Sequence, residues 1–189
     1  GTLNNDSAMS FSPIEEHDTM DDICTKVLNN TASALLTLRE EVDVQTLDLA
    51  ITTLKSAEHV AIFALGSSAS VADDAQYKLV RAGINAAART DGYMMNLCAQ
   101  QLGNHDVAMF ISRSGQTAEL LEALNIAVER GAKIFALAPP NSAIAKKSDA
   151  LIVVNTNETR QTKPAMLTRI LQLALIDVLA VGLTAAADR

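Results

Sequence analysis

The chain has 189 residues, 49% of them hydrophobic, so it is long and apolar enough to bury the core of one domain. Its formal net charge of −7 and its lack of Trp argue against binding of DNA or RNA by this chain itself, because phosphate contacts need clustered Lys and Arg and single strands need stacking side chains. The two cysteines, Cys24 and Cys98, have no metal-ligand spacing, so we expect free thiols in a cytoplasmic protein that uses no metal or cofactor.

The N-terminal part of the chain is predicted to be a linker followed by two helices. Residues 1–18 are polar and aperiodic, and we interpret them as a linker or tag remnant. Apolar residues then recur at helical spacing over 20–38, and a second such stripe over 44–54 follows Asp43, a typical N-cap. We therefore assign 19–56 to helices that pack on the following domain or on a partner chain.

From residue 57 onward, short apolar runs alternate with helical segments. Runs that are typical of buried strands occupy 60–65, 107–111, 133–137 and 151–154, with a weaker candidate at 84–88. Helices are expected from Gly66 to about Ala82, over 94–102, from the turn at 112–117 to Gly131, and from about Pro164. This alternation predicts that 57–189 form a doubly wound α/β domain, flavodoxin-like, with a five-stranded parallel sheet flanked by helices.

The final predicted helix is apolar nearly all round, which indicates burial on more than one side. Gln172 and Asp177 interrupt its most apolar stretch, 171–187, so we do not expect it to cross a membrane. Together with the two N-terminal helices it offers more apolar surface than one sheet face covers. We therefore expect a dimer or tetramer.

Two turns rich in Ser follow predicted strands: Gly66-Ser67-Ser68 and Ser112-Arg113-Ser114-Gly115-Gln116-Thr117. The carboxyl ends of parallel strands meet at one sheet edge, and ligands of such sheets bind there. Hydroxyls and free N–H groups at a helix N-terminus bind anions, and a phosphate monoester suits this chemistry. The candidate ligand-binding residues in these turns are Ser67, Ser68, Ser112, Ser114, Gly115, Gln116 and Thr117. The alternative is that each hydroxyl merely caps a helix.

The pattern Ser112-x-Ser114-Gly115-x-Thr117, preceded by Gly66-Ser67-Ser68, resembles the phosphosugar loops of sugar-isomerase (SIS) domains. The segments 73–78, 140–142 and 169–179 further resemble the C-terminal domain of RpiR-family bacterial transcriptional regulators, and 180–184 resembles the HexR sub-type. This resemblance implies an effector-sensing domain for a phosphorylated sugar or sugar acid, 2-keto-3-deoxy-6-phosphogluconate in HexR-like members. It also implies DNA binding only through a separate N-terminal helix-turn-helix domain.

An aldose–ketose isomerase for phosphosugars is the alternative function. Such a reaction needs a general base and usually an acid beside the substrate. His59 and His105 precede strands, at the edge opposite the turns, while Asp91 and Glu158 are single carboxylates without an evident partner. Glu158 serves equally well as an acceptor for sugar hydroxyls, and we include it among the ligand-binding residues. We therefore favour a sensor with no catalytic residues over an enzyme.

Overall fold

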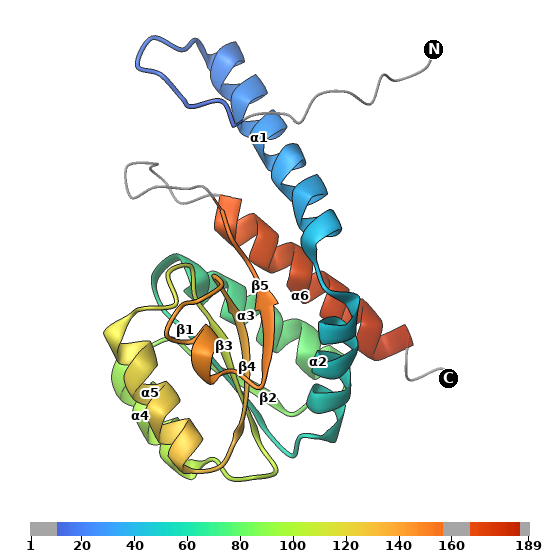
Figure 1. Ribbon diagram of the computed structural model, residues 1–189, viewed down its shortest axis with the longest axis vertical. Coiled ribbons are helices and arrows are strands. Elements are labelled where there is room, and N and C mark those ends of the chain that lie inside the picture. Colours follow the sequence, from blue (N-terminus) through green and yellow to red (C-terminus); the bar gives the residue numbers. More distant parts are fainter. Residues whose placement is uncertain (1–10, 157–166, 186–189) are drawn as a thin grey trace. The chain divides into compact units, whose positions relative to one another are not determined.

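The computed structural model describes residues 11–156 and 167–185. The chain divides into two compact units, Gly1–Glu41 and Val42–Arg189. The larger unit contains the whole sheet, and its elements are labelled in Figure 1.

Five parallel strands form one sheet in the order β2-β1-β3-β4-β5. They are β1 (Val60–Ala64), β2 (Ala86–Arg89), β3 (Val107–Ile111), β4 (Lys133–Ala138) and β5 (Ala150–Val153). Every residue of β1 and β3 is buried, which is why these strands read as continuous apolar runs. The order 2-1-3-4-5 is that of a flavodoxin-like doubly wound sheet, and the predicted fold class is confirmed.

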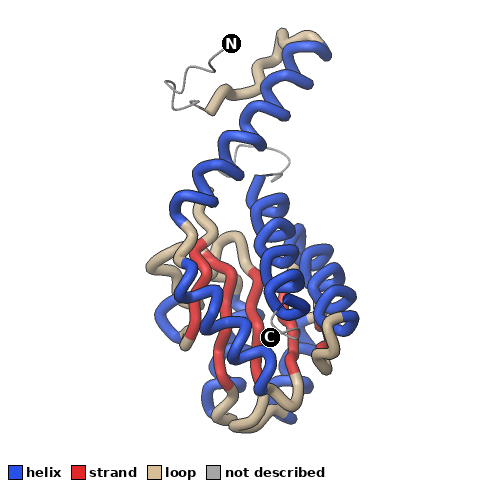
Figure 2. The backbone as a smooth tube through the Cα atoms, turned by 90° about the vertical axis from the view of Figure 1, so that its right-hand side faces the viewer, coloured by secondary structure: helices blue, strands red, loops and turns tan. Residues whose placement is uncertain are grey.

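Helices cover both faces of the sheet (Figure 2). They are α2 (Val44–Ser56), α3 (Ala69–Arg81), α4 (Gly92–Gln101), α5 (Ala118–Glu129) and α6 (Leu167–Ala185). Helix α4 packs beside α5, whereas α3 packs against α6 and α2 contacts both α6 and β5. The core beneath α4 and α5 includes the tilted ring pair of Phe63 and Phe110, with centroids 5.2 Å apart.

Helix α6 is buried along the face that meets α3, where Leu171, Leu175 and Leu179 lie. Val178 and Val181 on the same helix are exposed in the single chain, so burial of α6 on a further side stays a prediction for the assembled protein. By length and composition alone, α6 is apolar enough to cross a membrane, and it is the one such helix among the described residues. A core helix of a globular domain passes the same test, and the buried leucine face fits that description.

The expected element bounds differ from the observed ones mainly around β2. This strand begins at Ala86 rather than Ile84, because the N–H of Ile84 bonds to Leu79 O and closes the end of α3. Gly83 provides the positive φ of 83° that this turn needs. Some apolar residues of the expected helical stripes are exposed, among them Met20 of 20–38 and Val44 of 44–54, and Val128 on α5 is exposed as well.

The smaller unit contains α1 (Met20–Glu41) and the segment before it. Residues of the expected linker fold back on this helix: the N–H of Ser12 donates to Asn30 Oδ1 at 3.0 Å, and Asn30 Nδ2 donates to Ser12 O at 2.8 Å. Lys26 Nζ also lies 2.7 Å from Asp18 Oδ1, and this contact lowers the pKa of Asp18. Packing of α1 on a partner chain stays a prediction.

Candidate functional site

The two serine-rich turns lie side by side at the carboxyl edge of the sheet. Strand β1 pairs directly with β3, with Ala64 opposite Ile111, so the turns that follow these residues are neighbours. Helix α3 leaves the first turn toward one face of the sheet and α5 leaves the second toward the other face. This divergence is the topological switch point, where doubly wound sheets bind their ligands. The expectation that both turns share one edge is confirmed.

The first turn presents one serine to solvent and buries the other. Gly66 has φ of 59° and begins a short 3₁₀ turn, Gly66–Ser68. Ser67 is exposed, and its hydroxyl has no hydrogen-bond partner among the described residues. Ser68 is buried, and its Oγ donates to Oε1 of Gln172 on α6 at 3.1 Å. Ser67 is thus the reachable hydroxyl of this turn.

The second turn is held together by its own serines. Ser112 is buried, and its Oγ accepts a 2.9 Å hydrogen bond from the N–H of Gly115. The exposed Ser114 Oγ accepts from the N–H of Gln116 at 3.2 Å and lies 3.5 Å from Thr117 Oγ1. Ser112 therefore shapes the turn, while Ser114 and Thr117 place two hydroxyls close together on its outer side.

A third segment, which the candidate residues did not include, lies against the second turn. It follows β4, and the N–H of Ile144 donates to Gly115 O at 3.2 Å. Gly115 has φ of 61°, and a Cβ at this position would clash with Ser142. Asn141 also has a positive φ, of 62°, and is exposed. A strand followed by two prolines and an Asn was the available sequence signal, since Asn tolerates this backbone conformation.

The two helices that begin at these turns lack side-chain caps. Ser68 and Thr117 occupy the N-cap positions of α3 and α5, and neither side chain accepts a hydrogen bond from the first turn of its helix. The first N–H groups of an α-helix have no partner within the helix, and those of α5 are therefore available to an anion. On α3, the N–H of Ala69 already donates to Gly66 O in the preceding 3₁₀ turn. The capping alternative does not hold at these two positions.

Arg113 is a residue of the second turn and is exposed, whereas Lys78 and Arg81 lie toward the far end of α3. Lys78 forms ion pairs with Asp177 and Asp74, and these bonds raise its pKa. The guanidinium of Arg81 lies 5.6 Å from the centre of the Tyr77 ring, at the far end of α3. Arg160 and Lys163, like the ligand-binding candidate Glu158, lie outside the described residues.

The candidates for acid–base catalysis have other roles in the structure. The Asp91 carboxylate caps α4, because its Oδ1 accepts from the N–H of Met94 at 3.0 Å. His59 and His105 come just before β1 and β3, at the amino edge of the sheet, as expected. None of these three groups lies in either serine-rich turn.

The chain resembles known proteins of two kinds. It is 40% identical to the Bifunctional protein glk of Burkholderia thailandensis over 92% of this chain and 27% of that protein. It is 32% identical to the HTH-type transcriptional regulator HexR of Pseudomonas aeruginosa over 97% of this chain and 64% of that protein. The chain thus spans about a quarter of the first relative and under two thirds of the second.

The fold and the family agree with these relatives. The solved structure of the Vibrio vulnificus NanR protein complexed with ManNAc-6P superposes with a TM-score of 0.84 at 24% identity, covering 89% of this chain and 64% of that one. Residues 53–182 match the SIS domain family, which is most of the chain. The resemblance noted in the two serine-rich turns is therefore confirmed, and the chain belongs to the SIS domain family.

Proposed function

We propose that the chain is the effector-sensing domain of a cytoplasmic transcriptional regulator of sugar metabolism, with a phosphosugar as its ligand. The observation that carries the proposal is the pair of serine-rich turns at the switch point, each followed by a helix without a side-chain cap. Hydroxyls and free helix N–H groups bind a phosphate without needing a charged side chain, and the second turn also carries the exposed Arg113. The similarity to HexR supports a regulator.

In the proposed phosphate site, some residues contact the ligand and others hold the two turns in shape. Ser67, Ser114 and Thr117 provide hydroxyls to the ligand, and the first N–H groups of α5 complete the anion site. The buried pair Ser68 and Ser112 holds the two turns in shape through bonds inside the protein. Gly115 and Gln116 belong to the same site, where their N–H groups donate to Ser112 and Ser114 and so shape the turn around the ligand. Glu158 accepts hydrogen bonds from the sugar hydroxyls.

The proposed ligand is a phosphorylated sugar or sugar acid, with 2-keto-3-deoxy-6-phosphogluconate as the first candidate. HexR is a relative of this chain, and the structural neighbour NanR was solved with ManNAc-6P, a phosphosugar. DNA contact would come from a separate helix-turn-helix domain, since the chain carries a net charge of −7.

We further propose that the chain does not catalyse isomerisation. Asp91 is committed to capping α4, and both histidines that precede strands lie at the opposite edge from the turns. A general base must come within hydrogen-bond reach of the proton that it removes. Incubation with aldose and ketose phosphates should give no turnover above a buffer control. Turnover that is lost in the Glu158→Gln variant would instead establish the isomerase.

A thermal-unfolding screen of phosphosugars and phosphorylated sugar acids tests the proposed function. A ligand that binds only the folded state stabilises it by about 3 kcal/mol at a hundred times its dissociation constant. We expect 2-keto-3-deoxy-6-phosphogluconate or a close relative to raise the midpoint, and the unphosphorylated compound to leave it nearly unchanged. Equal effects of both compounds, or no effect of any phosphosugar, would reject the phosphate site.

A further inference from the structure

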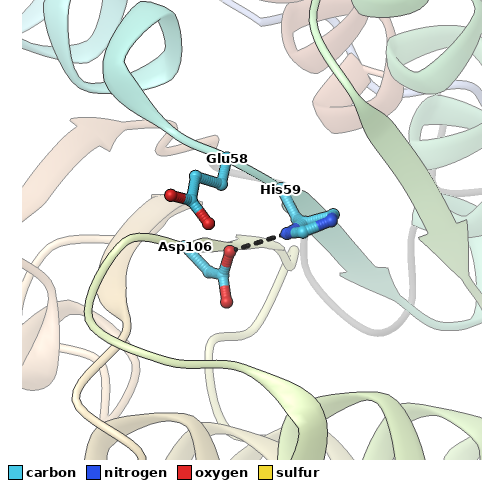
Figure 3. Close-up of side chains that lie close together, drawn as sticks. All are labelled: Glu58, His59 and Asp106. Atoms are coloured by element: carbon cyan, nitrogen blue, oxygen red, sulfur yellow. Dashed lines mark hydrogen bonds and ion pairs between the residues drawn. The ribbon is translucent and has the colours of Figure 1, made fainter.

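Three ligand-type side chains meet at the amino edge of the sheet, opposite the serine-rich turns. Glu58 and His59 precede β1, and Asp106 precedes β3 (Figure 3). One carboxylate oxygen from each acid and one imidazole nitrogen all lie within 4.8 Å of one another. His59 and Asp106 are 47 positions apart in the chain, so the cluster could not be predicted from the spacing of residues in the sequence.

Hydrogen bonds fix both the carboxylate and the backbone of Asp106. Its Oδ2 accepts a 2.8 Å hydrogen bond from the N–H of Gly103, which leaves Oδ1 facing Nδ1 of His59 at 3.0 Å. Its backbone O accepts from the N–H of Lys133 at the start of β4. A carboxylate whose second oxygen is fixed by an N–H group is pre-oriented for metal binding.

The backbone of the other two residues is also fixed by neighbouring strands. The O of His59 accepts from the N–H of Val107 at 2.9 Å, and the N–H of Glu58 donates to His105 O at 2.9 Å. Asn85 Nδ2 donates to Glu58 O at 3.2 Å. The side chains of Glu58 and His59 are exposed, so both are free to adjust around the fixed Asp106.

The cluster contains two carboxylates, and Arg89 lines the cavity beside it. Neither Glu58 nor Asp106 forms an ion pair with Lys or Arg in the described part of the chain. The Asp106 side chain is only 12% exposed, so its negative charge is largely shielded from water. A buried charge needs a partner, and His59 is the one ion-pair candidate that the described residues supply.

An open cavity of about 290 Å³ adjoins the cluster. His59 and Asp106 form part of its wall, together with Arg89, Cys98 and Gln101. A metal ion held by three protein ligands would therefore have space for water or a small anion at its remaining positions.

We propose that Glu58, His59 and Asp106 bind a divalent transition-metal ion, with Zn²⁺ as the best fit. Imidazole together with carboxylates suits Zn²⁺ better than Mg²⁺, which prefers oxygen ligands and water. Ligands of tetrahedral Zn²⁺ at about 2.0–2.2 Å from the metal lie roughly 3.4 Å apart, close to the spacing of His59 Nδ1 and Asp106 Oδ1. On binding, any proton on that nitrogen is released to solvent. This site is separate from the proposed phosphosugar site.

Calorimetric titration of the whole chain with ZnCl₂ tests the proposal. We expect one equivalent to bind, and His59→Ala, Glu58→Gln and Asp106→Asn each to weaken binding at least about tenfold. His105→Ala is the matched control, because it removes a neighbouring imidazole outside the cluster, and Cys98→Ser controls for the thiol in the cavity wall. Both controls should bind Zn²⁺ like the parent.

Three results would overturn the proposal: no Zn²⁺ uptake by the parent, unchanged binding in His59→Ala and Glu58→Gln, or an equal loss in His105→Ala. Thermal unfolding without metal shows whether each variant is folded. If Asp106→Asn is unfolded, the other two variants decide, because the His59 side chain is 63% exposed and Glu58 is exposed as well. A tenfold excess of MgCl₂ that abolished Zn²⁺ binding would reject the assigned metal class.

Discussion

The hydroxyl groups at the two serine-rich turns divide into two kinds. Ser68 and Ser112 are buried and bond to other parts of the protein, to Gln172 and to the N–H of Gly115. Ser67 and Ser114 are exposed at the same edge of the sheet. Changes at the buried pair should act on the shape of the turns, whereas changes at the exposed pair should act mainly on phosphate affinity.

We expect Ser67→Ala and Ser114→Ala each to weaken phosphosugar binding by about ten- to a hundredfold. A hydrogen bond to a charged group contributes roughly 1.5–3 kcal/mol, and about 1.4 kcal/mol corresponds to one decade in affinity. Calorimetry on the single variants and the double variant measures this, with the double variant expected to show no binding. The exposed Ser56→Ala on α2 serves as the control. Affinities equal to the parent's in all variants would place the ligand elsewhere.

Gly115→Ala should weaken phosphosugar binding more than Ser114→Ala does. The backbone of Gly115 has a left-handed conformation that side chains disfavour, and a Cβ added there would clash with Ser142. The left-handed backbone alone costs roughly 1–2 kcal/mol. Gly83→Ala is the matched control, since its φ is 83° and a Cβ there meets nothing within 4 Å. Ligand titration and thermal unfolding should show similar backbone strain in both variants but loss of binding only in Gly115→Ala.

The two cysteines should react at different rates with a thiol reagent at pH 8. Cys24 is exposed, whereas Cys98 is partly buried, and this burial raises the pKa of the Cys98 thiol above its usual value. Because the thiolate is the reactive form, a raised pKa leaves less of it at pH 8. The Cys24→Ser variant should retain only the slow phase and Cys98→Ser only the fast one. Equal rates would show that the cavity beside Cys98 admits the reagent freely.

At the scale of single elements, Asp91 tests whether a side chain caps a helix or performs chemistry. It caps α4 through the N–H of Met94. Asp91→Ala should lower the free energy of unfolding by about 1 kcal/mol, and Asp91→Asn should restore most of it, because Asn is also a good cap. Urea denaturation measures both. A loss of turnover in Asp91→Asn without a loss of stability would support the isomerase.

The elements that sequence predicted best are those whose burial is uniform. Strands β1 and β3 are buried at every position, so an apolar run reveals them directly. Strand β2 was placed two residues early, because the apolar Ile84 closes the turn after α3 instead of joining the sheet. Exposure of Val44 and Val128 was missed since periodicity gives a helix face but not its partner.

For the site, the sequence predicted where the turns lie but not which of their serines are buried and which are exposed. Parallel strands bring successive turns to one edge, so this placement needed only the fold class. Burial of Ser68 depends on Gln172, a partner 104 positions away, which no local pattern shows. Contact between Gly115 and the segment after β4 likewise arises from tertiary packing.

At the scale of the whole molecule, we still predict self-association, because apolar side chains on α3 and α6 are exposed. Tyr77, Val80, Val178 and Val181 are 46–66% exposed on these two packed helices. Light scattering should report a dimer or tetramer at micromolar concentration, and Val181→Glu should shift it toward the 20 kDa chain. Val128→Glu on α5 is the control with the same charge change. A parent that is monomeric would reject the prediction.

The bond between Ser68 and Gln172 has a consequence for synthesis on the ribosome. All five strands and the first four helices of the larger unit can emerge before Gln172 does, because α6 is the last described element. Until then Ser68 has no acceptor on α6, and the turn after β1 lacks its hydrogen bond to Gln172. A nascent chain that stops short of α6 should therefore have its sheet sequence in place but should not yet respond to the effector.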